Sequence, residues 1–304
     1  MSAPRVTLTG ATGLIGTRLV GALQARGAQI TVLTRDPEHA RSKLGAVEAV
    51  AWSMLEEPAP AQALAGRDAV VHLAGEPVAQ RWSARAKEAI RESRVLGTRH
   101  LIEGLQRVQE RPRALVSSSA IGYYGAHGEE PLDEDAPPGR DFLAQVCVAW
   151  EAEAERGVEL GMRCVRVRTG VVLDPDGGAL ARMLPPFRLG LGGPVAGGRQ
   201  YISWIHLEDQ VEIVLAALAG EDWSGPVNAT APEPVTNRDF SRALGRALGR
   251  PAIAPVPGIA LRALYGEMAE IVTTGARVVP AKALVLGYEF RHPQLDAALR
   301  SALG

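Results

Sequence analysis

Cysteine, lysine and long hydrophobic runs are scarce in this 304-residue sequence, and each scarcity excludes a class of protein. Two cysteines, Cys147 and Cys164, form neither a disulfide framework nor a zinc cage. The six histidines show no metal-ligand spacing, so we expect no metal. No apolar segment reaches membrane-spanning length, and no signal-peptide pattern follows Met1. We therefore expect a cytoplasmic protein with no membrane partner.

An excess of either charge is also absent. Lys and Arg total 33 against 34 Asp and Glu, for a formal net charge of −1. Without a basic field to hold phosphate backbones, nucleic acid is not an expected partner. Only three of the basic residues are lysines: Lys43, Lys87 and Lys282. A hydrophobic fraction of 46% is enough to bury the core of one large domain or of two joined ones.

Short apolar runs alternate with helical patterns along the first half of the chain. The helical patterns cover residues 14–26, 83–109 and 141–160, and the expected strands are 5–9, 29–34, 69–74, 114–118 and 163–168. Continuous apolar runs are typical of parallel strands that are buried on both faces. The alternation predicts an α/β fold with a doubly wound parallel sheet.

The pattern changes after Gly170. Residues 183–204 are rich in Pro and Gly and indicate loops, whereas 205–218 predict a helix and 225–230 a short strand. A further amphipathic helix is expected at 237–249, with Asn237 as its cap. We expect residues 1–170 to form a nucleotide-binding domain to which 202–232 return. Residues 171–304 would otherwise form a smaller substrate-side and C-terminal α/β module.

A glycine-rich loop follows the first expected strand. "TLTGATGLIGTRL" places Gly10, Gly13 and Gly16 between that strand and a helix. Glycine allows the tight turn and the close approach to a pyrophosphate that a Rossmann-type site needs, although a tight turn with small-residue packing would also use it. With this context, we expect a dinucleotide to contact the loop through Gly10, Ala11, Thr12, Gly13, Leu14 and Ile15.

The end of the second strand indicates which dinucleotide is bound. Thr34 and Arg35 come first there, and Asp36 and Pro37 follow. An acidic residue would bind the ribose of NAD, whereas a guanidinium matches the 2′-phosphate of NADP. Because an Asp-Pro pair more often opens a turn or caps a helix, we favour NADP(H). An ordinary solvated strand end is the alternative for Arg35.

Three segments carry a resemblance to a known family: "HLAGEPV" at 72–78, the serine triplet at 117–119, and "YISWIHLEDQVEIVLAAL" at 201–218. With them the sequence resembles the extended short-chain dehydrogenase/reductases, and more narrowly their atypical sugar-nucleotide epimerase-like branch, which has its own C-terminal module. The resemblance implies that several further residues line the cofactor: Leu73, Ala74, Gly75, Ser117 and Val172, with Glu76 at the ribose edge.

Arg94 departs from the wider family pattern. The family has Asn-x-x-Gly-Thr on the next helix, and this chain has "RVLGT". The resemblance to the narrower branch implies that Arg94 reaches a cofactor phosphate. An ion pair on the helix surface with Glu92 is the alternative.

The proton-transfer pair of the superfamily is missing. Ser119 matches the family's serine, but Leu143 and Cys147 occupy the places of its Tyr-x-x-x-Lys pair. No tyrosine lies between Tyr124 and Tyr201, and no lysine lies between Lys87 and Lys282, so no other alignment restores the pair. A tyrosine with a pKa of about 10 is a poor base unless a nearby cation stabilises its phenolate.

Other groups must therefore move the proton if the protein is an enzyme. We take Ser119, Tyr123 and Tyr124 as the catalytic candidates, although Tyr123 is equally well explained as a structural aromatic. Arg168 or His206 could orient a substrate, and His206 could instead simply begin a helix.

Two functions remain in view. One is an NADP-dependent oxidoreductase or epimerase acting on a small hydroxyl or carbonyl compound, including a sugar nucleotide. The other is a non-catalytic NADP-binding sensor or regulatory protein, because one fold hosts both. The helices that contain Arg94 and Trp150 would either form a homodimer seam, as in relatives, or only cover the sheet.

Overall fold

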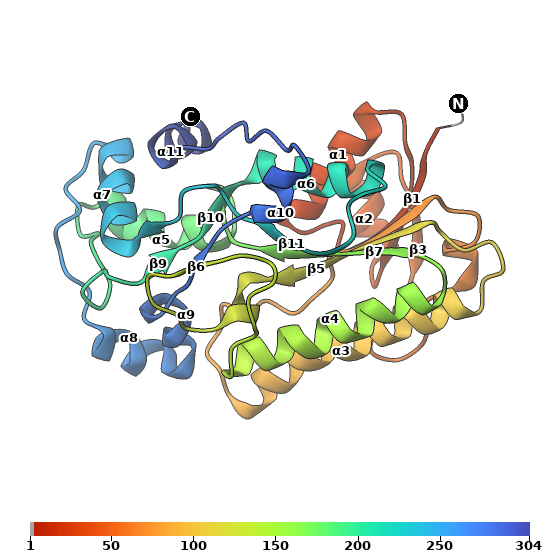
Figure 1. The fold of residues 1–304 in the computed structure, drawn as a ribbon, viewed down its shortest axis with the longest axis horizontal. Helices are drawn as coiled ribbons and strands as arrows, with labels where there is room; N and C mark the ends of the chain where they lie inside the picture. Colours follow the sequence, from red (N-terminus) through yellow and green to blue (C-terminus); the bar gives the residue numbers. More distant parts are fainter. Residues whose placement is uncertain (1–2) are drawn as a thin grey trace.

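Seven parallel strands form the central sheet of the structure, a computed structural model that describes residues 3–304 (Figure 1). Their spatial order is β11-β7-β5-β4-β1-β2-β3. The bounds are β1 (Arg5–Thr9), β2 (Gln29–Thr34), β3 (Glu48–Ala51), β4 (Ala69–His72), β5 (Ala114–Ala120), β7 (Arg163–Thr169) and β11 (Gly225–Ala229). This arrangement confirms the doubly wound α/β sheet predicted from the sequence. The strand order reverses between β1 and β4, where such sheets open a ligand-binding crevice.

Helices cover both faces of the sheet. On one face, α1 (Leu14–Ala25) and α2 (Pro37–Leu44) pack on β2, and α6 (Leu207–Ala219) packs on β5, β7 and β11. On the other face, the long helices α3 (Ala84–Gln106) and α4 (Phe142–Glu159) lie side by side (Figure 1). Ser83 and Asp141 cap these two helices, because their side-chain oxygens accept the backbone N–H of Ala86 and Ala144.

A smaller C-terminal part packs at the carboxyl ends of the strands. Its helices are α5 (Gly178–Arg188), α7 (Asn237–Leu248), α8 (Gly258–Tyr265), α9 (Glu270–Thr273), α10 (Ala281–Val285) and α11 (Leu295–Leu303). Among its short strands, β8 (Val171–Leu173) pairs with β10 (Trp204–His206), and β9 (Tyr201–Ile202) pairs with β12 (Val235–Thr236). Its last strand, β13 (Arg277–Val278), pairs with β6 (Pro131–Leu132), which lies between β5 and α4 in the chain. Helices α5, α7 and α11 share an apolar core around Trp204 and Phe240.

The C-terminal residues also reach back to the edge of the main sheet. On β11, the side-chain amide of Asn228 donates to the carbonyl of Val279 at 2.9 Å. The Glu134 carboxylate joins the same place, because it accepts the backbone N–H of Asn228 at 2.9 Å and of Lys282 at 3.1 Å. The described helices include none that is long and apolar enough to cross a membrane.

Three local predictions were wrong. Strand β3 was missed because it is short and partly exposed at the sheet edge. Residues 183–188 belong to α5 rather than to a loop, although Pro185 and Pro186 lie within them. Burial of Leu180, Leu184 and Phe187 in the C-terminal core outweighs the two prolines there. The cap of α7 is Thr236, while the Asn237 side chain accepts a hydrogen bond from the N–H of Val195.

Candidate functional site

The glycine loop has a geometry that only glycine allows. Gly10 has a φ of +67°, and a Cβ added to it would lie 2.7 Å from the backbone nitrogen of Ala74. A Cβ on Gly16 would collide with the carbonyl oxygen of Gly10 and with the backbone of Ala11. Because Gly10 and Gly16 have no side chains, β1, α1 and the segment after β4 can pack in close contact.

The loop opens into a cavity of about 360 Å³ at the switch point of the sheet. Its walls come from the carboxyl ends of β1, β4, β5 and β7 and from the starts of α1 and α5: Gly10, Gly13, Leu14, Ile15, Gly16, Leu73, Ser118, Gly170, Val171, Val172, Gly178 and Ala179. Within residues 3–304, no side chain caps the N-terminus of α1, so its amides face this space. Such a terminus favours an anion, and the site fits the pyrophosphate of a dinucleotide.

The predicted cofactor residues take several positions around this cavity. Gly10, Gly13, Leu14, Ile15, Leu73 and Val172 line it, and Ala74 touches Gly10. The carbonyl of the half-buried Thr12 accepts a hydrogen bond from the Lys43 ammonium. In β5 the lining serine is Ser118, whereas Ser117 is buried in the sheet. Sequence reasoning missed Ser118, although strand alternation places it on the opposite face from Ser117 and Ser119.

The tip of β2 separates Asp36 from Arg35. The Asp36 carboxylate accepts the N–H of His39 at 2.9 Å and caps α2, while the Thr34 hydroxyl accepts the N–H of Asp36 at 3.2 Å. The Asp36 carboxylate therefore caps α2. The Arg35 side chain is exposed at the end of β2.

Arg94 turns into the protein from α3. Its guanidinium donates to the carbonyls of Glu76 at 3.0 Å and Ile90 at 3.2 Å, and it lies 5.1 Å from the ring centre of Trp150. A Cβ on Gly75 would lie 3.3 Å from it. Burial lowers the pKa of Arg94, and the negative charge of the Glu76 carboxylate opposes that shift. A cation is therefore held against the segment after β4.

Apolar groups fill the positions of the missing pair on α4. A Cβ on Gly122 would lie 3.4 Å from Leu143 and 3.9 Å from the Cys147 sulfur. Burial raises the pKa of the Cys147 thiol to about 12, so the thiol is neutral at physiological pH. Helix α4 therefore contributes no tyrosine and lysine pair for proton transfer to the site.

The Ser119 hydroxyl belongs to a buried network. It donates to Glu151 at 2.6 Å, and Arg168 binds both oxygens of the same carboxylate at 2.8 and 2.9 Å. Burial would lower the pKa of Arg168, but hydrogen bonds and attraction to Glu151 raise it overall. Glu151 and Arg168 are both buried, so this bidentate pair ties α4 to β7.

Both tyrosines lie on the same arginine. The Tyr124 hydroxyl accepts from Arg168 at 2.9 Å and donates to the Asn228 carbonyl oxygen at 2.7 Å. Burial raises the pKa of Tyr124 to about 12, although Arg168 lowers it in part. The Tyr123 ring is half-buried, with the Arg168 guanidinium 3.5 Å from its centre. The network thus occupies the hydroxyls of Ser119 and Tyr124, and its members Glu151 and Asn228 were not singled out as site residues from the sequence.

Fold and cavity together define an α/β protein with a doubly wound sheet and a cavity at the switch point of that sheet. Residues 6–228 match the NAD dependent epimerase/dehydratase family, and residues 256–302 match a domain of unknown function, DUF1731. The chain belongs to this epimerase family, in its SDR39U1-like group with a C-terminal DUF1731 domain.

Similar proteins cover nearly the whole chain. An Arabidopsis thaliana protein named epimerase family protein SDR39U1 homolog, chloroplastic, is 41% identical over 98% of this chain and 86% of its own length. The Mus musculus epimerase family protein SDR39U1 is 38% identical over 98% and 99%. A crystal structure of human epimerase family protein SDR39U1 (isoform 2) with NADPH has a TM-score of 0.87 and 34% identity and covers 99% of each chain. A UDP-galactose 4-epimerase structure, at 22% identity and a TM-score of 0.75, shares the fold.

Proposed function

We propose that this chain binds NADP(H) in the glycine-loop cavity and transfers a hydride to or from a small hydroxyl or carbonyl compound. A sugar nucleotide is the substrate class that its family favours. The observation that carries the proposal is the cavity itself, which runs from the N-terminus of α1 to Val172 and Ser118. The human relative crystallised with NADPH supports the choice of cofactor. The cytoplasmic location expected from the sequence stays a prediction.

The chain's own residues account for the binding. The amides of Leu14 and Ile15 would hold the pyrophosphate, and Arg35 the 2′-phosphate. Val172 would lie against the nicotinamide, which supplies or accepts the hydride when bound. Arg94 would give a fixed positive charge beside Glu76. Because a guanidinium keeps its proton, Arg94 would orient groups and not transfer protons.

The hydroxyls nearest to a substrate oxygen differ from those that the family pattern suggests. Ser119 and Tyr124 would stabilise the scaffold, because each already has a buried hydrogen-bond partner. Ser118 would contact the substrate, because its residue lines the cavity. Tyr123 would be the remaining proton donor, held in place by Arg168.

Cofactor choice is tested by titrating NADPH and NADH separately into wild type and Arg35→Gln. Loss of a charge-assisted hydrogen bond costs about 1.5 to 3 kcal/mol, so NADPH affinity should fall about 10- to 100-fold while NADH affinity holds. Arg107→Gln, which replaces an exposed arginine at the far end of α3, is the matched control. Equal wild-type affinities for the two cofactors would contradict the assignment of Arg35.

Turnover is tested with NADPH and a panel of carbonyl compounds and sugar nucleotides. Net reduction removes the absorbance of the reduced nicotinamide, whereas epimerisation returns the hydride and needs NMR of the sugar. Ser118→Ala should slow either reaction and leave NADPH binding unchanged. If Ser118→Ala turns over at the wild-type rate, the assigned contact is wrong.

A second function is a non-catalytic NADP(H) sensor. Two observations favour this function. The hydroxyls of Ser119 and Tyr124 already have buried hydrogen-bond partners. Leu143 and Cys147 replace the tyrosine and lysine that transfer the proton in the wider superfamily. Tight NADPH binding with no turnover of any substrate in the panel would support the sensor over the enzyme.

A further inference from the structure

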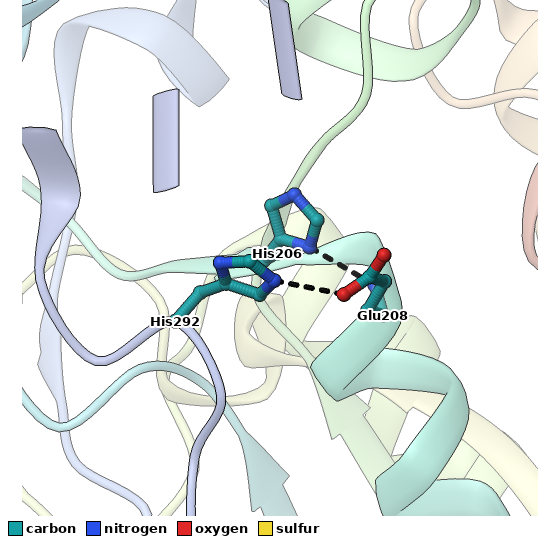
Figure 2. Close-up of side chains that lie close together, drawn as sticks. All are labelled: His206, Glu208 and His292. Carbon is teal, nitrogen blue, oxygen red and sulfur yellow. Dashed lines mark hydrogen bonds and ion pairs between the residues drawn. The ribbon is translucent and has the colours of Figure 1, made fainter. Parts of the chain in front are cut away.

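Two histidine rings stack where residues 286–294, which connect α10 to α11, cross the start of α6 (Figure 2). His206 ends β10, and His292 lies in this crossing segment. The ring centres are 3.7 Å apart, with 32° between the ring planes. The His206 residue is only 6% exposed. Because the His292 ring covers one face of the His206 ring, water reaches that face only when the crossing segment moves.

The contacts of the His206 ring require its neutral form. Its Nδ1 accepts the backbone N–H of Glu208 at 3.2 Å and so caps α6. A neutral ring can accept there because its single proton is on Nε2, whereas an imidazolium has an N–H at both positions. A proton on Nδ1 would therefore set two donors against each other and break the cap. Within residues 3–304 the buried Nε2 has no hydrogen-bond partner, so no acceptor there would stabilise a charged ring.

Four titratable groups face the His206 ring: His292 on the crossing segment, Glu208 and Asp209 on α6, and Asp174 after β8. The negative charges of the three carboxylates favour a proton on His206, but each carboxylate already accepts hydrogen bonds from other groups. Burial and the neighbouring His292 outweigh them, so the pKa of His206 is lowered from its ordinary value. The attached crossing segment therefore favours a neutral His206.

A buried carboxylate holds the crossing segment on α6. Asp209 is fully buried and accepts the backbone N–H groups of Arg291 at 2.8 Å and of His292 at 2.9 Å. The Tyr288 hydroxyl donates to the same carboxylate at 2.9 Å. The Arg291 guanidinium pairs with Glu212 on the same helix, 3.2 Å away. The stacked histidines extend this contact to the end of β10.

We propose that His206 and His292 form an acid-sensitive contact, which loosens the crossing segment from α6 when His206 gains a proton. That proton breaks the cap of α6 and places a cation against the neighbouring imidazole. The His206 ring escapes both only when the crossing segment moves away. The segment lies in the region that matches DUF1731, so the attachment of that region to α6 would depend on pH. The proposal needs neither NADP(H) nor catalysis.

The pH range follows from the two states of His206. When the crossing segment is loosened, the ring is solvated and has the ordinary histidine pKa of about 6.5. The attached state has the lower pKa and binds the proton less well. Attachment is therefore strongest above pH 6.5. As the pH falls below about 6.5, its equilibrium constant decreases by at most about tenfold per pH unit, until the pH reaches the lowered pKa of the attached state.

The test is hydrogen exchange, followed by mass spectrometry, on the full-length protein, with rates corrected for intrinsic exchange at each pH. Between about pH 7.5 and 5.5, protection of the crossing segment should fall about 3- to 10-fold in wild type, while protection of α1 should hold. His206→Asn removes the titrating ring and keeps a residue that caps helices well, so its crossing segment should not respond to pH. His127→Asn, which replaces an exposed histidine outside the contact, should behave as wild type does.

Three outcomes would overturn the proposal. The first is constant protection of the crossing segment in wild type. The second is an equal response in wild type and His206→Asn, which would place the proton elsewhere. The third is an equal loss of protection in α1 and the crossing segment, which would report global acid unfolding.

NMR of the wild-type protein with isotope-labelled histidine rings gives a readout that needs no folded variant. Nδ1 of His206 should carry no proton at neutral pH and should gain one below about pH 6.5, together with a change at the backbone amide of His292. A proton on that Nδ1 at neutral pH would likewise overturn the proposal.

Discussion

Removing the Arg168 guanidinium should destabilise the protein more than most single changes. Arg168→Met leaves the Glu151 carboxylate buried, with the Ser119 hydroxyl as its remaining donor and the Arg166 guanidinium 3.9 Å away. The Arg168 and Glu151 side chains are only 3% and 8% exposed. Breaking a buried ion pair on one side costs about 3 to 5 kcal/mol, because the other charge loses its hydrogen-bonded partner. Arg166 compensates the Glu151 charge only in part, because its Nε lies 3.9 Å away, beyond hydrogen-bond distance.

The assay is unfolding by heat and by urea, followed by circular dichroism. Unfolding entropy scales with chain length, so 3 to 5 kcal/mol corresponds to a melting-temperature decrease of about 5 to 8 °C for this chain. The control is the double variant Arg168→Met with Glu151→Leu, which removes both charges and should recover much of the loss.

A small effect would refute the reasoning. If Arg168→Met unfolds within about 1 kcal/mol of wild type, water reaches Glu151 and the network is not a structural one. Ser119 and Tyr124 would then be available for chemistry, and the assignment of the scaffold role would fall. If the double variant is as unstable as Arg168→Met, the loss comes from packing and not from an uncompensated charge.

Two further predictions follow from buried groups. Burial lowers the pKa of His72 to about 4. In the unfolded chain the histidine pKa is about 6.5, so between pH 4 and 6.5 the unfolded chain binds more protons than the folded one. The free energy of unfolding should therefore decrease by about 3 kcal/mol as the pH falls from 6.5 to 4. Urea unfolding across this range should show a smaller dependence of this free energy on pH for His72→Gln. Gly16→Ala should abolish NADPH binding in a fluorescence titration, because its Cβ meets the Gly10 carbonyl, whereas Gly21→Ala on α1 meets no atom within 4 Å and should bind normally. Binding by Gly16→Ala would contradict the close-packed loop.

Much of the fold was predictable because buried parallel strands are short apolar runs. The runs at 5–9, 29–34 and 163–168 need no distant information to be recognised. Strand β3 lies at a sheet edge and lacks such a run. Helix α5 contains Pro185 and Pro186, and only its contacts in the C-terminal core reveal why it forms.

The candidate site likewise has parts that the sequence predicts and parts that only the fold reveals. The glycine loop is continuous in sequence, and Asp36 could be assigned to a helix cap because Pro37 follows it. The partners of Ser119 come from distant elements, and no local pattern indicates that Glu151 and Arg168 meet it.

The contact between β11 and the C-terminal segment has a consequence for synthesis on the ribosome. The side-chain amide of Asn228 finds its acceptor only in Val279, and the Glu134 carboxylate meets the backbone of Lys282. Chains emerge amino-terminus first, so about 50 more residues must be synthesised after β11 before this edge of the sheet is covered. At the emergence rates typical of translation, that delay lasts roughly 3 to 10 s, during which the exposed edge strand is open to chaperones or to mispairing.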